Sequence, residues 1–472
     1  MMLDDRPQRR SWPRRLLNRA EVDRATFFAL LLRSWQLVAG AVSVVLISWF
    51  FSPELQGYYY TFWSLLALQT FFELGMYLVI ISAASHEWSK LQLDEHGEIA
   101  GDATAFSRLV GLGRWIAVWY GVLAVLFSVV VGVAGAVFFS LKPTDEISWF
   151  RPWIVLVVLS GGLLWTLPWN ALLEGCNQVT AVNRFRVWQA IAANVTVWAA
   201  ISWGAGLWAA VATAAVRLAA ELFFLGWQYG RFFRPFWRKA DGPGIDWRAD
   251  IWPMQWRIAI SGTFSYFEFF LCTPVLFYYH GPVIAGQMGM TWTLITALQG
   301  AALAWVQARA PLFGMLVAKQ EYGELDRVYF RLTGISLAAL AVGSMAAWGL
   351  VCGLYWSELW MAERLLPPLA TAIFLLATVL YQAPRCQDFY LRAHKREPLW
   401  WLNALSSTLI GLLVWLWGAR YGATGAATGY LAAVFTFILP SKTYLWSRCR
   451  REWHQDPADD RVVSSGSDRS VR

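Results

Sequence analysis

Apolar stretches long enough to cross a lipid bilayer recur along almost the whole chain. A membrane span needs roughly 20 predominantly apolar residues. Such stretches are predicted at 26–51, 58–85, 115–140, 152–173, 185–204, 207–228, 254–279, 283–305, 328–354, 365–390, 399–417 and 421–446. Hydrophobic residues make up 57% of the 472 residues, and a water-soluble domain could not bury that much apolar surface. The sequence therefore predicts an all-α integral membrane protein with about twelve transmembrane helices.

The basic residues fall almost entirely on one side of the predicted membrane. Seven arginines precede the first span, and of the 39 Lys and Arg residues the outer loops hold only Lys142, Arg151, Arg364 and Arg420. Cytoplasmic loops of membrane proteins carry an excess of Lys and Arg, so both termini are expected in the cytoplasm. The net charge of +8 follows from this topology and gives no reason to expect a nucleic-acid partner.

One helical hairpin motif occurs twice in the sequence. Residues 52–57 (SPELQG) open an apolar helix that carries Gln69, and residues 281–286 (GPVIAG) open one that carries Gln299. The spacing from Pro to Gly is four residues in both copies. This duplication predicts two six-helix lobes, related by a pseudo-twofold axis along the membrane normal. Transporters built from such repeats bind their substrate where the repeats meet.

The expected organisation has five parts. They are a basic cytoplasmic N-terminal segment (1–25), an N-lobe of helices 1–6 (26–229), a cytoplasmic linker (230–253), a C-lobe of helices 7–12 (254–446) and a disordered cytoplasmic tail (447–472).

Three arginines lie within or beside predicted spans. Ionisable groups inside a membrane are costly and mostly face a cavity or a partner. Arg33 lies about 10 Å into helix 1, at 1.5 Å per residue, and Arg257 lies near the start of helix 7. Two guanidinium groups could bind a phosphate or pyrophosphate through paired hydrogen bonds; the alternative is that they reach back to the cytoplasmic interface. Arg217 and Glu221 are four residues apart on helix 6 and therefore lie on one face of it. They could form a structural ion pair or a charged wall of a cavity.

Two further carboxyl groups and two amides are candidates for function. Glu73 and Glu268 are predicted in mid-span, where a desolvated carboxyl group can hold a proton. With Glu221 they are candidates for proton or sodium coupling, or they are neutral groups bonded to a neighbouring helix. Gln69 and Gln299 could bond sugar hydroxyls in a cavity, or could fasten one helix to another.

Several functional classes find no support in the sequence. There is no phosphate-binding GxxxxGK[ST] loop, no nucleophile elbow and no His pattern typical of a metal site. Five scattered Cys residues without CxxC spacing predict neither a disulfide framework nor a zinc site. We therefore expect no catalytic residues, no metal and no cofactor. The short outer loops also argue against a membrane glycan ligase or polymerase.

The run from Phe51 to Phe62, FSPELQGYYYTF, resembles the first-hairpin signature of bacterial Wzx-type polysaccharide flippases. These proteins belong to the multidrug/oligosaccharidyl-lipid/polysaccharide exporter superfamily. The predicted twelve helices, two lobes and cytoplasmic termini match that superfamily over about residues 26–446.

The resemblance implies an alternating-access flippase in the bacterial cytoplasmic (inner) membrane. Its substrate would be an oligosaccharide linked to undecaprenyl pyrophosphate, moved to the outer leaflet for exopolysaccharide or O-antigen synthesis. Arg33, Arg257 and Arg217 are the residues that could supply a cationic cavity. A polysaccharide polymerase or glycosyltransferases would be partners, besides membrane lipid. Two alternatives stay open: a cation-coupled multidrug exporter of the same fold, and a non-transporting scaffold of a glycan-synthesis complex.

Overall fold

The computed structural model describes residues 24–94, 96–141, 147–237, 252–394 and 398–454, without the side chains of 252–258, 260 and 261. The chain divides into two compact units. Unit 1 comprises Met1–Phe50, Gly75–Ala136 and Ser148–Gln255. Unit 2 comprises Phe51–Leu74, Val137–Ile147 and Trp256–Arg472. The segment from Phe51 to Leu74, which the sequence places with the first lobe, therefore packs with the helices of the second half of the chain.

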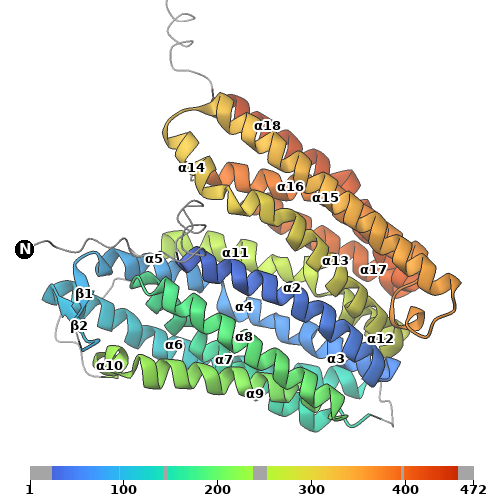
Figure 1. Cartoon of the computed structure of the whole chain (residues 1–472), viewed down its shortest axis with the longest axis horizontal. Coiled ribbons are helices and arrows are strands. Elements are labelled where there is room, and N and C mark those ends of the chain that lie inside the picture. Colours follow the sequence, from blue (N-terminus) through green and yellow to red (C-terminus); the bar gives the residue numbers. More distant parts are fainter. Residues whose placement is uncertain (1–23, 95, 142–146, 238–251, 395–397, 455–472) are drawn as a thin grey trace, which may run out of the picture. The chain divides into compact units, whose positions relative to one another are not determined.

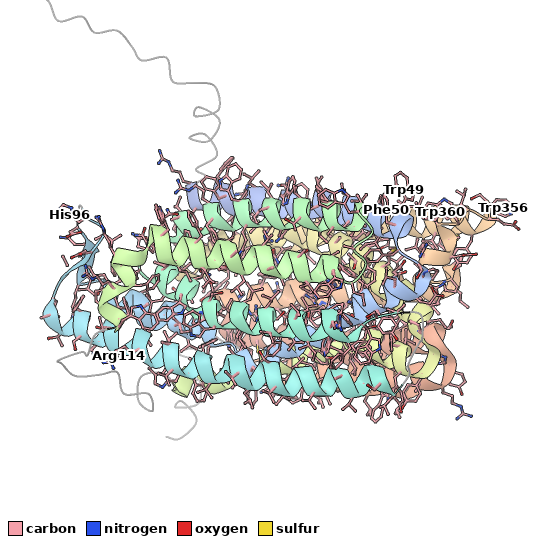
Figure 2. The ribbon with its side chains drawn as sticks, turned by 90° about the horizontal axis from the view of Figure 1, so that it is seen from below. Trp49, Phe50, His96, Arg114, Trp356 and Trp360 are labelled. Carbon is pink, nitrogen blue, oxygen red and sulfur yellow. The ribbon has the colours of Figure 1, made fainter. Side chains whose placement is uncertain are left out.

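Unit 1 is a bundle of long helices with a small hairpin at one end (Figure 1). Its elements are α2 (Arg24–Phe50), α5 (Met76–Trp88), β1 (Leu91–Leu93), β2 (Ile99–Gly101), α6 (Ala103–Ser140, whose last turn belongs to unit 2), α7 (Phe150–Gly175), α8 (Val179–Ser202), α9 (Trp208–Phe223), the π-helical turn η2 (Phe224–Gln228), α10 (Gly230–Phe233) and η3 (Arg234–Trp237). The two strands pair antiparallel, with Leu91 opposite Gly101. Trp49 and Phe50 lie at the opposite end of unit 1 from His96 and Arg114 (Figure 2).

Unit 2 contains the remaining helices. They are α3 (Pro53–Leu66), η1 (Ala67–Gln69), α4 (Thr70–Glu73), α11 (Trp252–Phe269), α12 (Cys272–His280), α13 (Pro282–Ala308), α14 (Ala310–Ala318), α15 (Tyr322–Trp356), η5 (Ala362–Arg364), α16 (Pro368–Ala393), α17 (Trp400–Ala433), η6 (Val434–Ile438) and α18 (Leu439–Trp453). One apolar core joins α12, α13, α16 and α17, and a second joins α13–α18 around Tyr329, Tyr390 and Trp446.

Every predicted span falls on helix, which confirms the all-α membrane class. By length and apolar composition alone, eight helical segments of the described chain can cross a membrane, or nine when one bent pair is counted as a span. One of the eight, Trp400–Trp453, holds the last two predicted spans, because Gly422 has non-helical dihedrals (φ 66°, ψ −148°) and reverses the chain. Two predicted spans, 185–204 on α8 and 254–279 on the pair α11–α12, are not among these eight or nine segments. Large apolar side chains face outward on many of the helices, as in the exposed stripe Val118, Val122, Val125, Val129 and Val133 of α6.

The second predicted span is broken. Leu74 and Gly75 both adopt left-handed dihedrals (φ 51° and 65°), and the segments Pro53–Glu73 and Met76–Trp88 meet at 44°. A leucine in this region is strained, because its Cβ approaches the following carbonyl group. The chain passes from unit 2 to unit 1 at this break.

The two copies of the repeated hairpin pack against each other inside unit 2. Helix α3 begins at Pro53, with the Ser52 hydroxyl accepting a hydrogen bond from the Leu55 N–H (3.1 Å), and α13 begins at Pro282. Proline is well suited to the first helical turn. A Cβ on Gly57 would overlap the Pro282 carbonyl oxygen, and one on Gly286 would lie 2.8 Å from the Gly57 nitrogen. The shared glycine therefore serves a close helix crossing.

Candidate functional site

A buried ion pair lies among the helices of unit 2. Glu268, near the end of α11, is buried, and its Oε1 lies 2.6 Å from Nη2 of Arg385 on α16. Tyr381 donates to the other carboxylate oxygen (3.1 Å), as does Ser407 of α17 (3.3 Å). The Arg385 guanidinium also lies 4.8 Å from the Phe269 ring centroid. One carboxylate thus fastens three helices, and its charge is balanced by a guanidinium group.

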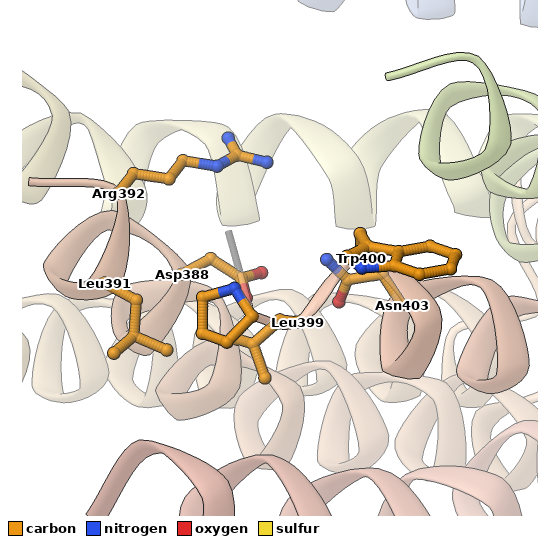
Figure 3. Close-up of a pocket in the computed structure, with 7 residues that line it drawn as sticks. Asp388, Leu391, Arg392, Leu399, Trp400 and Asn403 are labelled. Carbon is orange, nitrogen blue, oxygen red and sulfur yellow. The ribbon is translucent and has the colours of Figure 1, made fainter. Parts of the chain in front are cut away.

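A second charge pair continues this network along α16. Lys442 of α18 is almost fully buried, and its Nζ lies 3.3 Å from Asp388 and 5.5 Å from the Tyr381 ring centroid. Beside Asp388 is a small pocket whose polar lining includes Arg392 of α16 and Asn403 of α17 (Figure 3). Its volume of about 10 Å³ is close to that needed for one water molecule. The Asn403 Oδ1 atom is buried and has no hydrogen-bond partner among the described residues, so it is a ready acceptor there.

Unit 1 buries a glutamate with neutral partners. Glu221 of α9 accepts hydrogen bonds from Nδ2 of Asn170 on α7 (2.8 Å) and from Nε2 of Gln189 on α8 (2.9 Å). Gln189 also donates to the backbone carbonyl of Arg217 (3.1 Å). The carboxylate therefore bonds amides across three helices. Arg217, an exposed residue, interacts with Glu221 electrostatically, and no ion pair within 4 Å joins the two side chains among the described residues.

A nearby ion pair completes the polar interior of unit 1. Arg186 of α8 lies 2.7 Å from the carboxylate of Glu174 on α7, and its guanidinium also donates to the Tyr77 hydroxyl of α5. Arg186 and Arg385 lie near the ends of the predicted spans 185–204 and 365–390, and nothing in the sequence predicted a partner for either of them. Both lie within helices that continue past the predicted span ends, and each is used to balance a carboxylate.

The predicted phosphate-binding arginines are distributed over both units. Arg33 is exposed on α2, and Arg217 is exposed on α9, both in unit 1. Arg257 lies in α11 in unit 2, and its side chain falls outside the described side chains. The structure thus presents two intramembrane guanidinium groups of unit 1 on helix surfaces.

The remaining predicted residues all lie in unit 2. Glu73 is half-buried at the end of α4, immediately before the helix break, and makes no hydrogen bond or ion pair with another described residue. Gln69 is half-buried in η1. Gln299 is buried in α13, and its Nε2 has no hydrogen-bond partner among the described residues. Within the part of the chain that the structure describes, no cluster of His, Cys, Asp and Glu could hold a metal ion.

Sequence reasoning missed the partners of these carboxylates. Asn170, Gln189 and Arg385 carry no local signal, because they lie 51, 32 and 117 residues from the groups they bind. Gln56 had a signal, since it lies inside the repeated hairpin motif. It is buried, and its amide donates to the carbonyls of Gly286 (2.9 Å) and Arg364 (3.1 Å).

Comparison with solved structures assigns the fold. An inward-facing multidrug resistance MATE family transporter of the MOP superfamily superposes with a TM-score of 0.65 at 12% identity, over 88% of this chain and 95% of that one. A MATE transporter of Vibrio cholerae gives 0.56 at 12% identity, over 92% and 96%. A MOP superfamily transporter of Pyrococcus furiosus, described as having a binding pocket of reverse polarity, gives 0.54 at 14% identity, over 91% and 95%. The sequence matches no protein-family model and no curated protein. The chain therefore has the two-lobe, all-helical fold of MATE transporters.

Proposed function

We propose that this protein is a transporter of the MOP superfamily that flips an oligosaccharide linked to polyprenyl pyrophosphate. It would carry this lipid from the cytoplasmic to the outer leaflet of the bacterial inner membrane by alternating access, with both termini in the cytoplasm. The fold supports a transporter, and the hairpin run FSPELQGYYYTF supports a flippase over a drug exporter.

The observation that carries the substrate class is which charged residues of the spans are exposed. The carboxylates of Glu174, Glu221 and Glu268 are all bonded to protein groups. Arg33 on α2 and Arg217 on α9 are exposed residues. An anionic headgroup needs accessible guanidinium groups, whereas an organic cation needs accessible carboxylates. The surplus of accessible positive charge favours a pyrophosphate.

In this proposal the predicted residues have separate roles. Arg33, Arg217 and Arg257 neutralise the pyrophosphate, while Gln69 and Gln299 bond glycan hydroxyls. A polar path lowers the cost of moving hydroxyl groups past hydrocarbon. Glu73, Glu221 and Glu268 are the candidates for proton or sodium coupling. Glycosyltransferases or a polysaccharide polymerase would act as partners on either side of the membrane.

One feature favours the cation-coupled multidrug exporter. Glu73 is an intramembrane carboxylate without a described partner, located where the chain passes between the two units. Such a group is suited to binding an organic cation or a coupling ion. This alternative predicts that organic cations bind and that Glu73→Gln abolishes their binding.

Thermal unfolding of the purified protein in detergent separates the two functions. The protein is titrated in turn with undecaprenyl-pyrophosphate-linked glycan, with tetraphenylphosphonium and with uncharged undecaprenol. A ligand at 100 times its Kd stabilises the folded state by about 2.7 kcal/mol. We expect stabilisation by the pyrophosphate lipid only, and its loss in Arg33→Gln but not in the control Arg231→Gln, an exposed arginine outside the spans.

The other results each select a rival. Stabilisation by tetraphenylphosphonium alone would identify a drug exporter. Stabilisation by none of the three ligands would favour the scaffold, which also predicts that cells keep exporting glycan when Arg33 and Arg217 are both replaced.

A further inference from the structure

Unit 2 contains a ligand-sized cavity whose lining includes none of the intramembrane charges described above. Its volume is about 660 Å³, within the range of small-molecule sites. Its walls come from the first residue of α3, the first two turns of α13, the last turn of α15 and the segment from Glu358 to Glu363. Trp356 and Trp360, which neighbour Glu358 in the chain, lie at this end of unit 2 (Figure 2).

The wall formed by the segment after α15 is fastened in place by side chains. Gln287 of α13 donates to the carbonyl of Glu363 (3.0 Å), and Gln56 of α3 donates to that of Arg364 (3.1 Å). Tyr355 donates to the carbonyl of Leu365 (3.1 Å). These bonds, from three helices to consecutive carbonyl groups, fix the wall before any ligand arrives, and a preformed wall lowers the entropic cost of binding.

Glu358 occupies a backbone position that ordinarily belongs to glycine. It follows the end of α15 with φ 52°, and the Leu359 N–H closes the helix on the Leu354 carbonyl (3.2 Å). Helices that end with a left-handed residue usually carry glycine there, because a Cβ is strained in that conformation. The Glu358 side chain lines the cavity, although its backbone is held in this strained conformation.

The lining offers the groups that recognise a sugar. It combines the carboxylates of Glu358 and Glu363 with the Gln287 amide, the Tyr355 ring and apolar side chains of Pro53, Val283 and Leu359. Carboxylates accept strong hydrogen bonds from hydroxyl groups, and an aromatic ring can cover the apolar face of a pyranose. Neither carboxylate forms an ion pair with another described residue within 4 Å, although Arg364 acts electrostatically on Glu363. Both carboxylates line the cavity, whereas Arg364 does not, so the lining repels an acidic ligand.

We propose that this cavity binds the glycan of the substrate, and that the glycan is neutral or carries amino sugars. The inference rests on the proposed function, which supplies a glycan and places this end of unit 2 on the outer side of the membrane. The cavity would then receive the glycan after the headgroup has crossed, and would exclude uronic-acid chains.

Soluble oligosaccharides test the cavity apart from the lipid. Binding to the full-length protein in nanodiscs is measured by saturation-transfer NMR and calorimetry, with maltotetraose, a glucosamine tetramer and trigalacturonate as probes. We expect the first two to bind and the acidic trimer not to bind. Glu358→Gly and Glu363→Gln should each weaken binding about tenfold, the equivalent of one lost hydrogen bond to a charged group. The control is Glu324→Gln, at the other end of α15, which should change nothing.

Glu358→Gly separates a binding role from a structural one. Glycine relieves the left-handed strain, so the melting temperature should stay equal or rise while affinity falls. Unchanged affinity in both variants, or equal binding of trigalacturonate, would overturn the proposal. If no soluble glycan binds while the lipid-linked one still stabilises the protein, the cavity proposal fails and the flippase stands. If soluble glycans bind through Glu358 but the lipid-linked form does not stabilise, the flippase fails instead.

Discussion

Unit 1 and unit 2 each bury a glutamate inside the membrane-spanning bundle, but the two carboxylates have different kinds of partner. Glu221 in unit 1 accepts hydrogen bonds from two amides, Asn170 and Gln189. Glu268 in unit 2 contacts a guanidinium group, Arg385, besides two hydroxyl groups. Two glutamates, both predicted as candidates for ion coupling, therefore form a site with neutral donors and a site with a compensating charge.

The difference decides what each site can exchange. An anionic ligand can compete with Glu268 for Arg385, and a proton can compete with Arg385 for the Glu268 carboxylate, because the pair is held by opposite charges. Glu221 has no buried cation as a direct partner, so a cation or a proton is the species it can take up. We therefore expect exchange of the ion pair in unit 2 and uptake of positive charge in unit 1.

The largest effect is expected from breaking the charge pair in unit 2. Arg385→Leu leaves Glu268 buried without its counter-charge, and removal of one partner of a buried pair costs about 3–5 kcal/mol. We expect the free energy of unfolding, measured by SDS titration in mixed micelles, to fall by that amount. Adding Glu268→Gln to the variant removes the stranded charge and should restore most of the loss. A double variant as unstable as Arg385→Leu alone would show that packing, and not charge, dominates this site.

A smaller effect is expected in unit 1, where no counter-charge is lost. Glu221→Gln keeps the shape of the side chain, and each of its hydrogen bonds is worth about 1 kcal/mol net. We expect a loss of unfolding free energy of about 1–2 kcal/mol, since one of the two amide donors must now face an amide nitrogen. Asn170→Leu, which leaves the carboxylate with one donor fewer, should cost more than Glu221→Gln. The reverse order would show that Glu221 is not ionised in the folded protein, and the contrast between the units would disappear.

The sequence predicted the helices of this protein much better than it predicted the contacts within the site. Spans are visible because a bilayer requires long apolar runs, and each predicted run is helical. The site pairings depend on helix rotation and on helix ends. Arg385 and Arg186 lie near the ends of predicted spans, where the apolar pattern gives no sign of a partner. The helices α16 and α8 continue past those ends, and both side chains contact carboxylates.

The sequence pattern also did not predict the local backbone conformation at two positions. The break at Leu74–Gly75 interrupts an apolar run that reads as continuous, since only Gly75 marks it. The last helix, predicted to end at residue 446, continues to Trp453. Its extra turns are stabilised by burial of Trp446 and Cys449 and by the contact of Arg450 with Asp326 of α15.

That last contact belongs to a third cluster of charge, at the end of unit 2. Tyr390 of α16 donates to Asp326 (2.6 Å), which also accepts from Arg450 of α18 (3.1 Å). His394 and His454 follow the ends of α16 and α18, and their Nε2 atoms are 3.2 Å apart. His394 Nδ1 lies 3.1 Å from the Tyr390 carbonyl, which can only accept, so this ring nitrogen carries a proton. The histidine pair joins the end of α16 to the end of α18, and protonation of both rings would place two positive charges side by side.

We expect the smallest effect on the free energy of unfolding at this histidine pair. It extends the comparison to a group that titrates. Burial lowers the pKa of His454 below its ordinary 6.5, helped by the nearby His394 and Arg450 and opposed by Asp326. A histidine with a lowered pKa binds more protons in the unfolded state than in the folded state. The folded protein therefore loses stability as the pH falls below about 6.5, and its stability does not depend on this group at higher pH. For one group the slope is at most about 1.4 kcal/mol per pH unit. Unfolding free energies of the wild type and His454→Gln, measured between pH 8 and pH 5, should agree above pH 7, apart from a constant offset, and diverge below 6.5, where the variant has the flatter profile. Parallel profiles would assign the acid sensitivity to other groups and leave Glu268–Arg385 and Glu221 as the charged sites by which the two units differ.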